Sequence, residues 1–148
     1  MGALTEPLRE FLDANPVGVL ATESREGTPR QSLVYYARDG EQLLISTLDD
    51  RLKARDVKRS GWASLCVMGH EPPYPSATFS GPAAILTDNI GAPTATIMQR
   101  MTGATEAPEP MSDEALAEVG RVILAITVKR VTSANYVPAA TEASEGPR

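Results

Sequence analysis

Five basic residues stand close together in the segment ISTLDDRLKARDVKRS, which spans residues 45–60. The chain as a whole is acidic, because it has 14 lysines and arginines against 19 aspartates and glutamates. Within this segment a predicted strand ends at Ser46 and Thr47, and a predicted helix begins near Arg51. A helix N-terminus attracts anions through its free backbone N–H groups and its dipole. With the hydroxyls of Ser46 and Thr47 and the charges of Arg51 and Lys53, the segment is a candidate phosphate site.

The same residues also fit an alternative in which they form only a solvated basic helix face. Asp49, Asp50 and Asp56 lie within reach as ion-pair partners, and exposed pairs of this kind contribute little energy. Periodicity alone does not separate the two interpretations, so both stay open at this point. In either one the remaining basic residues are mostly solvated: Arg55, Lys58 and Arg59.

Composition excludes several other chemistries. One cysteine and one histidine cannot make an intramolecular disulfide or a zinc site. Cys66 and His70 are separated by about 13 Å of extended strand, so we expect Cys66 in the core and His70 at the start of a loop. The phosphate-binding motifs G-x-x-x-x-G-K-[ST] and G-x-G-x-x-G are absent, and the net charge of -5 argues against general nucleic-acid binding. We assign no metal site and no catalytic residue.

The length of 148 residues fits a single domain, which we place at 1–138, with a disordered tail at 139–148. The first 16 residues are charged and amphipathic and lack the apolar run of a signal peptide. No later stretch is long and apolar enough to span a membrane. Together with the single cysteine, these features predict a cytoplasmic protein that does not bind membranes.

Alternating apolar residues predict six strands, at residues 17–24, 30–38, 41–47, 62–69, 76–88 and 121–137. The pair Asp39-Gly40 is a hairpin signal, and Gly81-Pro82 predicts a bulge. Helices are expected near residues 4–15, 51–59, 88–101 and 112–120. The candidate caps are Thr5 for the first helix, Asp49 and Asp50 for the second and Ser112 for the fourth, and Ser60-Gly61 marks the end of the second helix. Hairpin connections favour an antiparallel sheet, and six short strands close most simply into a small barrel with helices at its edges.

Three stretches together carry a family resemblance. The segment GTPRQSLVYYARDGEQLLISTLDDRLKARDVKRSGWASLCV, followed by PYPSATFSGPAAI and RVILAITVKRVTSANYV, resembles the flavin-binding split-barrel superfamily related to pyridoxamine 5'-phosphate oxidase. It is most similar to the branch that uses the deazaflavin coenzyme F-420. In that branch a strand ending in Ser or Thr leads into R-x-K-x-x-N-L, which here reads RLKARDV. The resemblance implies a mainly β fold, a six-stranded antiparallel split β-barrel of the FMN-binding type with peripheral helices.

The resemblance also implies a homodimer with a cofactor at each side of the subunit interface. Ser46, Thr47, Arg51 and Lys53 would hold the cofactor phosphate, and Arg55 would extend the positive surface. Tyr74 would reach the site from the partner subunit. The cofactor ring would be lined by one strand, partly through its backbone: Gln31, Ser32, Leu33 and Val34.

Asp56 departs from the family pattern, because the family has asparagine at this position. A carboxylate near a phosphate is repulsive unless Lys53 or Arg59 neutralises it. Arg55, Lys58 and Arg59 extend the basic surface beyond what one phosphate requires. This favours F-420, which carries a phosphodiester and an oligoglutamate tail, over FMN, which presents one phosphate.

The resemblance implies an oxidoreductase that transfers a hydride from reduced F-420 to a small or planar organic substrate. An FMN-dependent oxidase or reductase on the same fold is the first alternative. A non-catalytic protein that binds F-420, or haem or another tetrapyrrole with His70 as the axial ligand, is the second. The proton donor stays open among Tyr35, Tyr36, Tyr74, His70 and solvent. The segment 88–110, with Ile97, Met98 and Met101, either shapes the substrate entrance or only packs.

Overall fold

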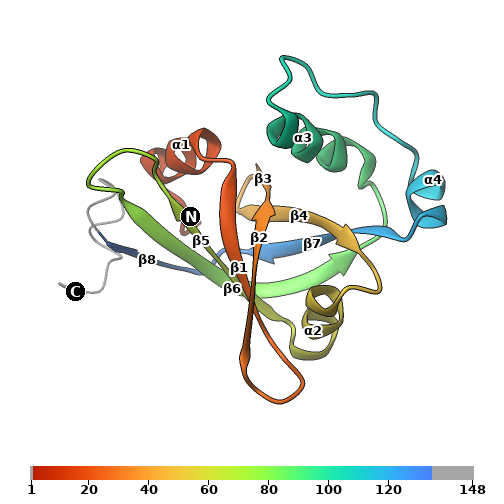
Figure 1. Ribbon diagram of the computed structural model, residues 1–148, viewed down its shortest axis with the longest axis horizontal. Coiled ribbons are helices and arrows are strands. Elements are labelled where there is room, and N and C mark those ends of the chain that lie inside the picture. The colour runs from red at the N-terminus through yellow and green to blue at the C-terminus, as the bar shows by residue number, and fades with distance from the viewer. Residues whose placement is uncertain (1, 135–148) are drawn as a thin grey trace.

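The computed structural model describes residues 2–134 and shows an antiparallel β-sheet curled into a half-barrel, with helices at its margins (Figure 1). The mainly β split-barrel prediction is therefore confirmed. The elements, in chain order, are α1 (Glu6–Ala14), β1 (Val17–Glu23), β2 (Pro29–Tyr35), β3 (Ala37–Asp39), β4 (Gln42–Leu48), α2 (Leu52–Ser60), β5 (Trp62–Met68), β6 (Ser76–Leu86), α3 (Gly91–Thr102), α4 (Asp113–Glu118), β7 (Arg121–Thr127) and β8 (Arg130–Ala134).

Eight strands stand in the described residues where six were expected, because two predicted strands are each interrupted once. The predicted strand 30–38 breaks at Tyr36, whose side chain is fully buried, and this separates β2 from β3. The predicted strand 121–137 breaks at Val128 and Lys129, which separates β7 from β8. The boundary at residue 138 and the predicted tail 139–148 lie outside the described residues.

The strands follow the order β2-β1-β5-β6-β7-β4-β3, and β8 pairs with β6. The long strand β6 serves both halves of the sheet, since its residues 76–82 pair with β5 and its residues 83–86 pair with β7. On one edge of β6 the partner changes from β8, at residues 76–80, to β7, at residues 83–86, so the change falls at Gly81 and Pro82, the expected bulge position. A Cβ atom at Gly81 would lie 2.0 Å from the carbonyl oxygen of Thr127, so the close approach of these two strands requires glycine.

The main core fills the inside of the curled sheet. It contains alternate residues of the strands, including Leu20, Leu65, Phe79 and Leu124, and α1 closes it from one end with Leu8 and Leu12. The threonine predicted to cap α1 does so, because Thr5 accepts a hydrogen bond from the backbone N–H of Leu8 at 3.4 Å. A smaller core lies on the other face of β4 and β7, under α3 and α4.

Helix α2 packs against β1 and β6 and ends, as predicted, at a left-handed glycine. Gly61 has a φ of 70°, and its N–H donates to the carbonyl of Val57 at 2.8 Å. The predicted caps were wrong. The helix begins after Arg51, no side chain caps it within the described residues, and Asp49 instead pairs with Lys58. Within residues 2–134 we find no helix that combines the length and apolarity needed to cross a membrane.

Candidate functional site

The segment between β4 and α2 carries the residues predicted to hold a phosphate. Thr47 is buried, since β4 turns it toward the inside of the sheet, while Ser46 on the opposite face is half-buried. Arg51 is exposed and occupies the position before the first helical residue with extended backbone. Because no described side chain caps this helix end, its first N–H groups remain available to an anion. We call Ser46, Thr47, Arg51, Lys53 and Arg55 the β4–α2 cluster.

Ion pairs divide the five basic residues of the segment 51–59 into two groups. Lys58 pairs with Asp49, and Arg59 pairs with Asp56 at 3.4 Å. These two therefore fit the interpretation of a paired surface. The other three form no salt bridge with any residue in the range 2–134, although the protein is acidic overall: Arg51, Lys53 and Arg55.

Lys53 is the member of this group whose surroundings disfavour its positive charge. Its side chain is half-buried, and burial together with the positive charge of Arg51 holds its pKa below the ordinary lysine value. A bound anion would favour the charged form of Lys53 and relieve its repulsion from Arg51. The free protein thus holds a destabilised positive charge at the predicted phosphate position.

Asp56, which departs from the family pattern, is buried and engaged inside the protein. It accepts hydrogen bonds from Thr22 Oγ1 at 2.8 Å, Arg30 Nε at 2.8 Å and Arg59 Nη1 at 3.4 Å. Burial raises its pKa, but the bonds from Arg30 and Thr22 outweigh this effect, so the pKa lies below the usual aspartate value. Arg30 and Arg59 therefore neutralise the negative charge of Asp56, and Lys53 is not one of its partners.

The four residues predicted to line a ring lie on β2, an edge strand that pairs only with β1 within the described residues. Gln31 and Leu33 are exposed on its outer face, while Ser32 and Val34 are half-buried on its inner face. Side chains from both faces cannot line one flat surface, so at most half of them face a ring directly. β2 also lies next to β4, which brings this strand near the β4–α2 cluster.

Tyr74 is not brought to the β4–α2 cluster within one chain. It lies in the loop between β5 and β6, is 48% exposed and has a φ of 57°. Figure 1 shows this loop at the opposite end of the molecule from α2. A contribution from a partner subunit, as the resemblance implies, stays a prediction.

Arg121 is a neighbour of the cluster that sequence reasoning missed. The pairing of β4 with β7 places it opposite Leu48, and its Nη1 donates to Ser46 Oγ at 3.4 Å. It forms no salt bridge with another described residue. The sequence shows only that a basic residue begins a predicted strand. That this residue belongs to the site follows from the pairing of β4 with β7, which joins positions 73 residues apart.

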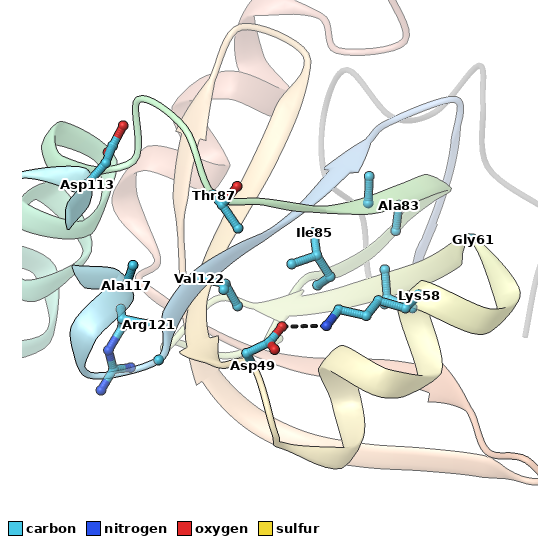
Figure 2. A pocket seen from close by; sticks show the side chains of 13 residues that line it. Asp49, Lys58, Gly61, Ala83, Ile85, Thr87, Asp113, Ala117, Arg121 and Val122 are labelled. Atoms are coloured by element: carbon cyan, nitrogen blue, oxygen red, sulfur yellow. Dashed lines mark hydrogen bonds and ion pairs between the residues drawn. The ribbon is translucent and has the colours of Figure 1, made fainter. Parts of the chain in front are cut away.

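A cavity with a volume of about 680 Å³ lies between α2, α4 and the ends of β6 and β7. Figure 2 shows Ile85 and Val122 on its floor and the Asp49–Lys58 ion pair on its rim, while the side chain of Arg121 points away from it. None of the ten predicted cofactor residues lines this cavity.

Cys66 was expected in the core but is exposed on the outer face of β5. His70 follows the end of β5 in a loop, as expected. Cys66 and His70 thus form no dyad at the candidate site, and the described residues contain no group of three or more His, Cys, Asp or Glu side chains able to hold a metal ion.

Three solved structures with the same fold are informative. An F420 reductase is 27% identical with a TM-score of 0.69, and the alignment covers 86% of this chain and 98% of the reductase chain. A conserved hypothetical protein of Mycobacterium tuberculosis is 22% identical with a TM-score of 0.70, covering 88% of this chain and 84% of that one. An FAD-binding protein of Mesorhizobium loti is 21% identical with a TM-score of 0.65, covering 88% and 93%.

No curated protein matches the chain significantly. A family profile described as pyridoxamine 5'-phosphate oxidase matches residues 4–135, which includes nearly every residue that the structure describes. That match spans both halves of the sheet, the β4–α2 cluster and the edge strand β2, and it agrees with the structural similarities. The chain therefore belongs to the pyridoxamine 5'-phosphate oxidase family.

Proposed function

We propose that the protein is a coenzyme F-420-dependent reductase that transfers a hydride from the reduced deazaflavin to a small or planar organic substrate. The observation that carries this proposal is the β4–α2 cluster, where Arg51, Lys53 and Arg55 lack acidic partners within residues 2–134 beside an uncapped helix end. The 27% identity to an F420 reductase, over nearly the whole of that chain, supports the same conclusion.

The extent of the positive surface favours F-420 over FMN. Lys53 and Arg51 with the helix end are sufficient for the single phosphate of FMN. Arg55, on α2, and Arg121, beside Ser46, add further positive charge near this phosphate position. Neither of them has an acidic partner in the described residues. A ligand with a phosphodiester and several tail carboxylates makes use of such an extended surface.

The residues of this chain would bind and orient the cofactor rather than perform acid–base chemistry. When bound, the reduced deazaflavin supplies the hydride, and the protein contributes position and shielding from water. Ser46, Arg51 and Lys53 would hold the phosphate, and β2 would support the ring. The proton that completes the reduction comes from solvent or an exposed side chain.

Tyr36 is unsuited to donate that proton. Its hydroxyl is buried within hydrogen-bond distance of the backbone carbonyls of Leu12, at 2.7 Å, and Asn15, and burial raises its pKa. Tyr35, in contrast, is partly exposed on the same face of β2 as Gln31 and Leu33. Of the side chains considered, Tyr35, Tyr74 and His70 therefore remain available.

The proposal includes a cytoplasmic homodimer in which each cofactor site is completed by the partner subunit. Tyr74, which lies away from the β4–α2 cluster in its own chain, would then contribute from the partner. In the segment 88–110, Ile97 packs in the smaller core. Met98 and Met101 are each 47% exposed on α3 and remain candidates for the substrate entrance.

Parallel fluorescence titrations with F-420 and FMN at fixed salt test the function. We expect F-420 to bind at micromolar concentration or tighter and FMN to bind more weakly. Lys53→Ala should weaken F-420 binding by about 1–3 kcal/mol, the cost of a charged hydrogen bond, whereas Lys129→Ala, which removes a lysine between β7 and β8, should not. Tighter binding of FMN would select the FMN-dependent alternative. If the protein bound neither F-420 nor FMN, the β4–α2 cluster would be only a solvated basic surface.

Hydride transfer separates a reductase from a carrier. Reduced F-420 should be oxidised when electron acceptors are added to the protein, and a carrier would bind F-420 without such turnover. A titration with haem, repeated with His70→Ala, addresses the remaining alternative. If the protein bound haem in a His70-dependent way and did not bind F-420, a haem-binding function would replace the reductase proposal.

A further inference from the structure

Asp56 joins three elements of the protein through one buried carboxylate. The side chain is on α2, its partner Thr22 is on β1, and its partner Arg30 is on β2. Arg59, one turn further along α2, donates to the same carboxylate and also to the backbone carbonyl of Glu23 at the end of β1. We call Thr22, Arg30, Asp56 and Arg59 the Asp56 network.

The network lies between the two groups of residues assigned to the cofactor. Arg30 immediately precedes Gln31 on β2, the strand proposed to support the ring. Asp56 lies three residues after Lys53 on α2, the helix whose start is proposed to bind the phosphate. Because β2 pairs only with β1 among the described residues, it is linked to α2 through β1 and through side-chain contacts. The bond between Arg30 Nε and Asp56 Oδ2, at 2.8 Å, is one such contact.

We propose that Asp56 is a positioning residue of the cofactor site, which holds β2 and α2 at the spacing that the ring and phosphate require. This inference rests on the proposed function. A site assembled before the ligand arrives binds more tightly, since less ordering is left to the binding step. The carboxylate of Asp56 accepts from two arginines at once, Arg30 and Arg59.

A purely electrostatic role predicts the opposite result. If Asp56 acted mainly as a negative charge near the bound anion, its removal would strengthen anion binding. If it acts by holding Arg30, its removal weakens binding although the net charge of the site becomes more positive. The direction of the change in affinity therefore distinguishes the two roles.

The test is a cycle of Asp56→Ala, Arg30→Ala and the double variant, titrated with F-420 under conditions where each is folded by circular dichroism. We expect each single variant to bind about tenfold more weakly and the double variant to match the larger single loss. Asp56→Asn keeps an oxygen acceptor and should retain affinity within threefold of the wild type. Asp13→Ala is the matched control, because it breaks a similar pair with Arg38, at 2.8 Å, between α1 and β3.

Amide hydrogen exchange of the free protein gives a second measurement that needs no cofactor. Asp56→Ala should accelerate exchange at residues 31–34 of β2, whereas Asp13→Ala should leave it unchanged. Unchanged or tighter F-420 binding by Asp56→Ala, or losses that multiply in the double variant, would overturn the positioning role. If the wild type binds neither F-420 nor FMN, the proposed function fails. In that case the exchange measurement still tests the link between β2 and α2, and unchanged exchange in the β2 strand of Asp56→Ala would reject that link.

Discussion

The carboxylate of Asp56 is stabilised in the folded protein more strongly than in the unfolded chain. Three donors hold its pKa below the usual aspartate value of about 3.9, although burial alone would raise it. A lowered folded-state pKa means that the stabilisation is complete above the unfolded pKa and is lost as the pH falls through the folded pKa. Asp56 therefore contributes most of its stabilisation at neutral pH and loses it in acid, below about pH 4.

Asp56→Asn should reduce the acid sensitivity of the fold. We expect the free energy of unfolding of the wild type to fall between pH 6 and pH 3, and the variant to lose less over the same interval because its amide does not titrate there. Urea unfolding at both pH values measures the difference. An equal loss in wild type and variant would show that the acid sensitivity arises at other groups.

Lys53 gives the cofactor site a pH dependence at the alkaline end. Its lowered pKa means that it loses its charge at a lower pH than an ordinary lysine, so affinity for an anionic cofactor should fall there. Lys53→Arg should bind F-420 with a flat profile over the same range, because arginine stays charged. Titrations at a series of alkaline pH values measure this. The same decline in Lys53→Arg would assign the effect to another group.

At the scale of secondary-structure elements, most local signals in the sequence were reliable, although Asp49 and Asp50 do not cap α2 as predicted. The turn at Asp39-Gly40 connects β3 and β4 as an antiparallel hairpin, as predicted, with Gly40 at a φ of 61°. The end of α2 at Gly61 and the cap of α4 at Ser112, which accepts from the N–H of Ala115 at 3.1 Å, were also predicted correctly. Each of these depends on a few neighbouring residues whose backbone preferences determine the outcome.

The features that were missed depend on contacts between distant segments. Tyr36 interrupts a regular apolar pattern because its ring enters the core and its hydroxyl reaches the end of α1. Arg121 becomes part of the candidate site only through the pairing of β4 with β7. Cys66 was placed in the core because a strand pattern does not say which of its two faces is covered.

The junction between the two halves of the sheet gives a prediction at the scale of an element. Gly81→Ala should lower the free energy of unfolding by about 3 kcal/mol, the upper end of overpacking costs, because its Cβ would collide with the backbone of β7. Gly103→Ala is the control: its φ is 73° but the space around it is open, so it should cost only about 1 kcal/mol. Denaturant unfolding compares them. Equal costs would mean that β6 and β7 can separate without penalty.

At the scale of the whole molecule, one face of the sheet is exposed although it carries apolar side chains. Strand register places Leu33, Val19, Cys66 and Thr78 in one row across β2, β1, β5 and β6. Leu33 is 76% exposed, and Met68 and Trp62, on the same face of β5 as Cys66, are 50% and 43% exposed. Large apolar patches of this kind are typical of surfaces that bind another protein, and the family resemblance implies that the partner is a second copy of the chain.

Leu33→Glu should therefore convert a dimer into a monomer. In a two-fold dimer through this face the substitution introduces a charge into both copies of the interface, and burying an unpaired charge is costly. Sedimentation velocity at micromolar concentration should give a dimer for the wild type and a monomer for the variant. Val119→Glu is the control, because Val119 is 60% exposed after α4, outside the row, and should leave the dimer intact.

Met68→Glu tests whether the cofactor site needs the second subunit, because Met68 is on the same exposed face of the sheet but is not a predicted cofactor residue. Tyr74 lies at the far end of its own chain, so a monomer lacks what the partner would provide. We expect Met68→Glu to give a monomer that binds F-420 at least tenfold more weakly while its thermal unfolding stays cooperative. Lys53 and Arg51 remain in place, so the monomer should still bind inorganic pyrophosphate weakly. A wild-type protein that is monomeric and yet binds F-420 tightly would show that one chain is sufficient and that this exposed face has another partner.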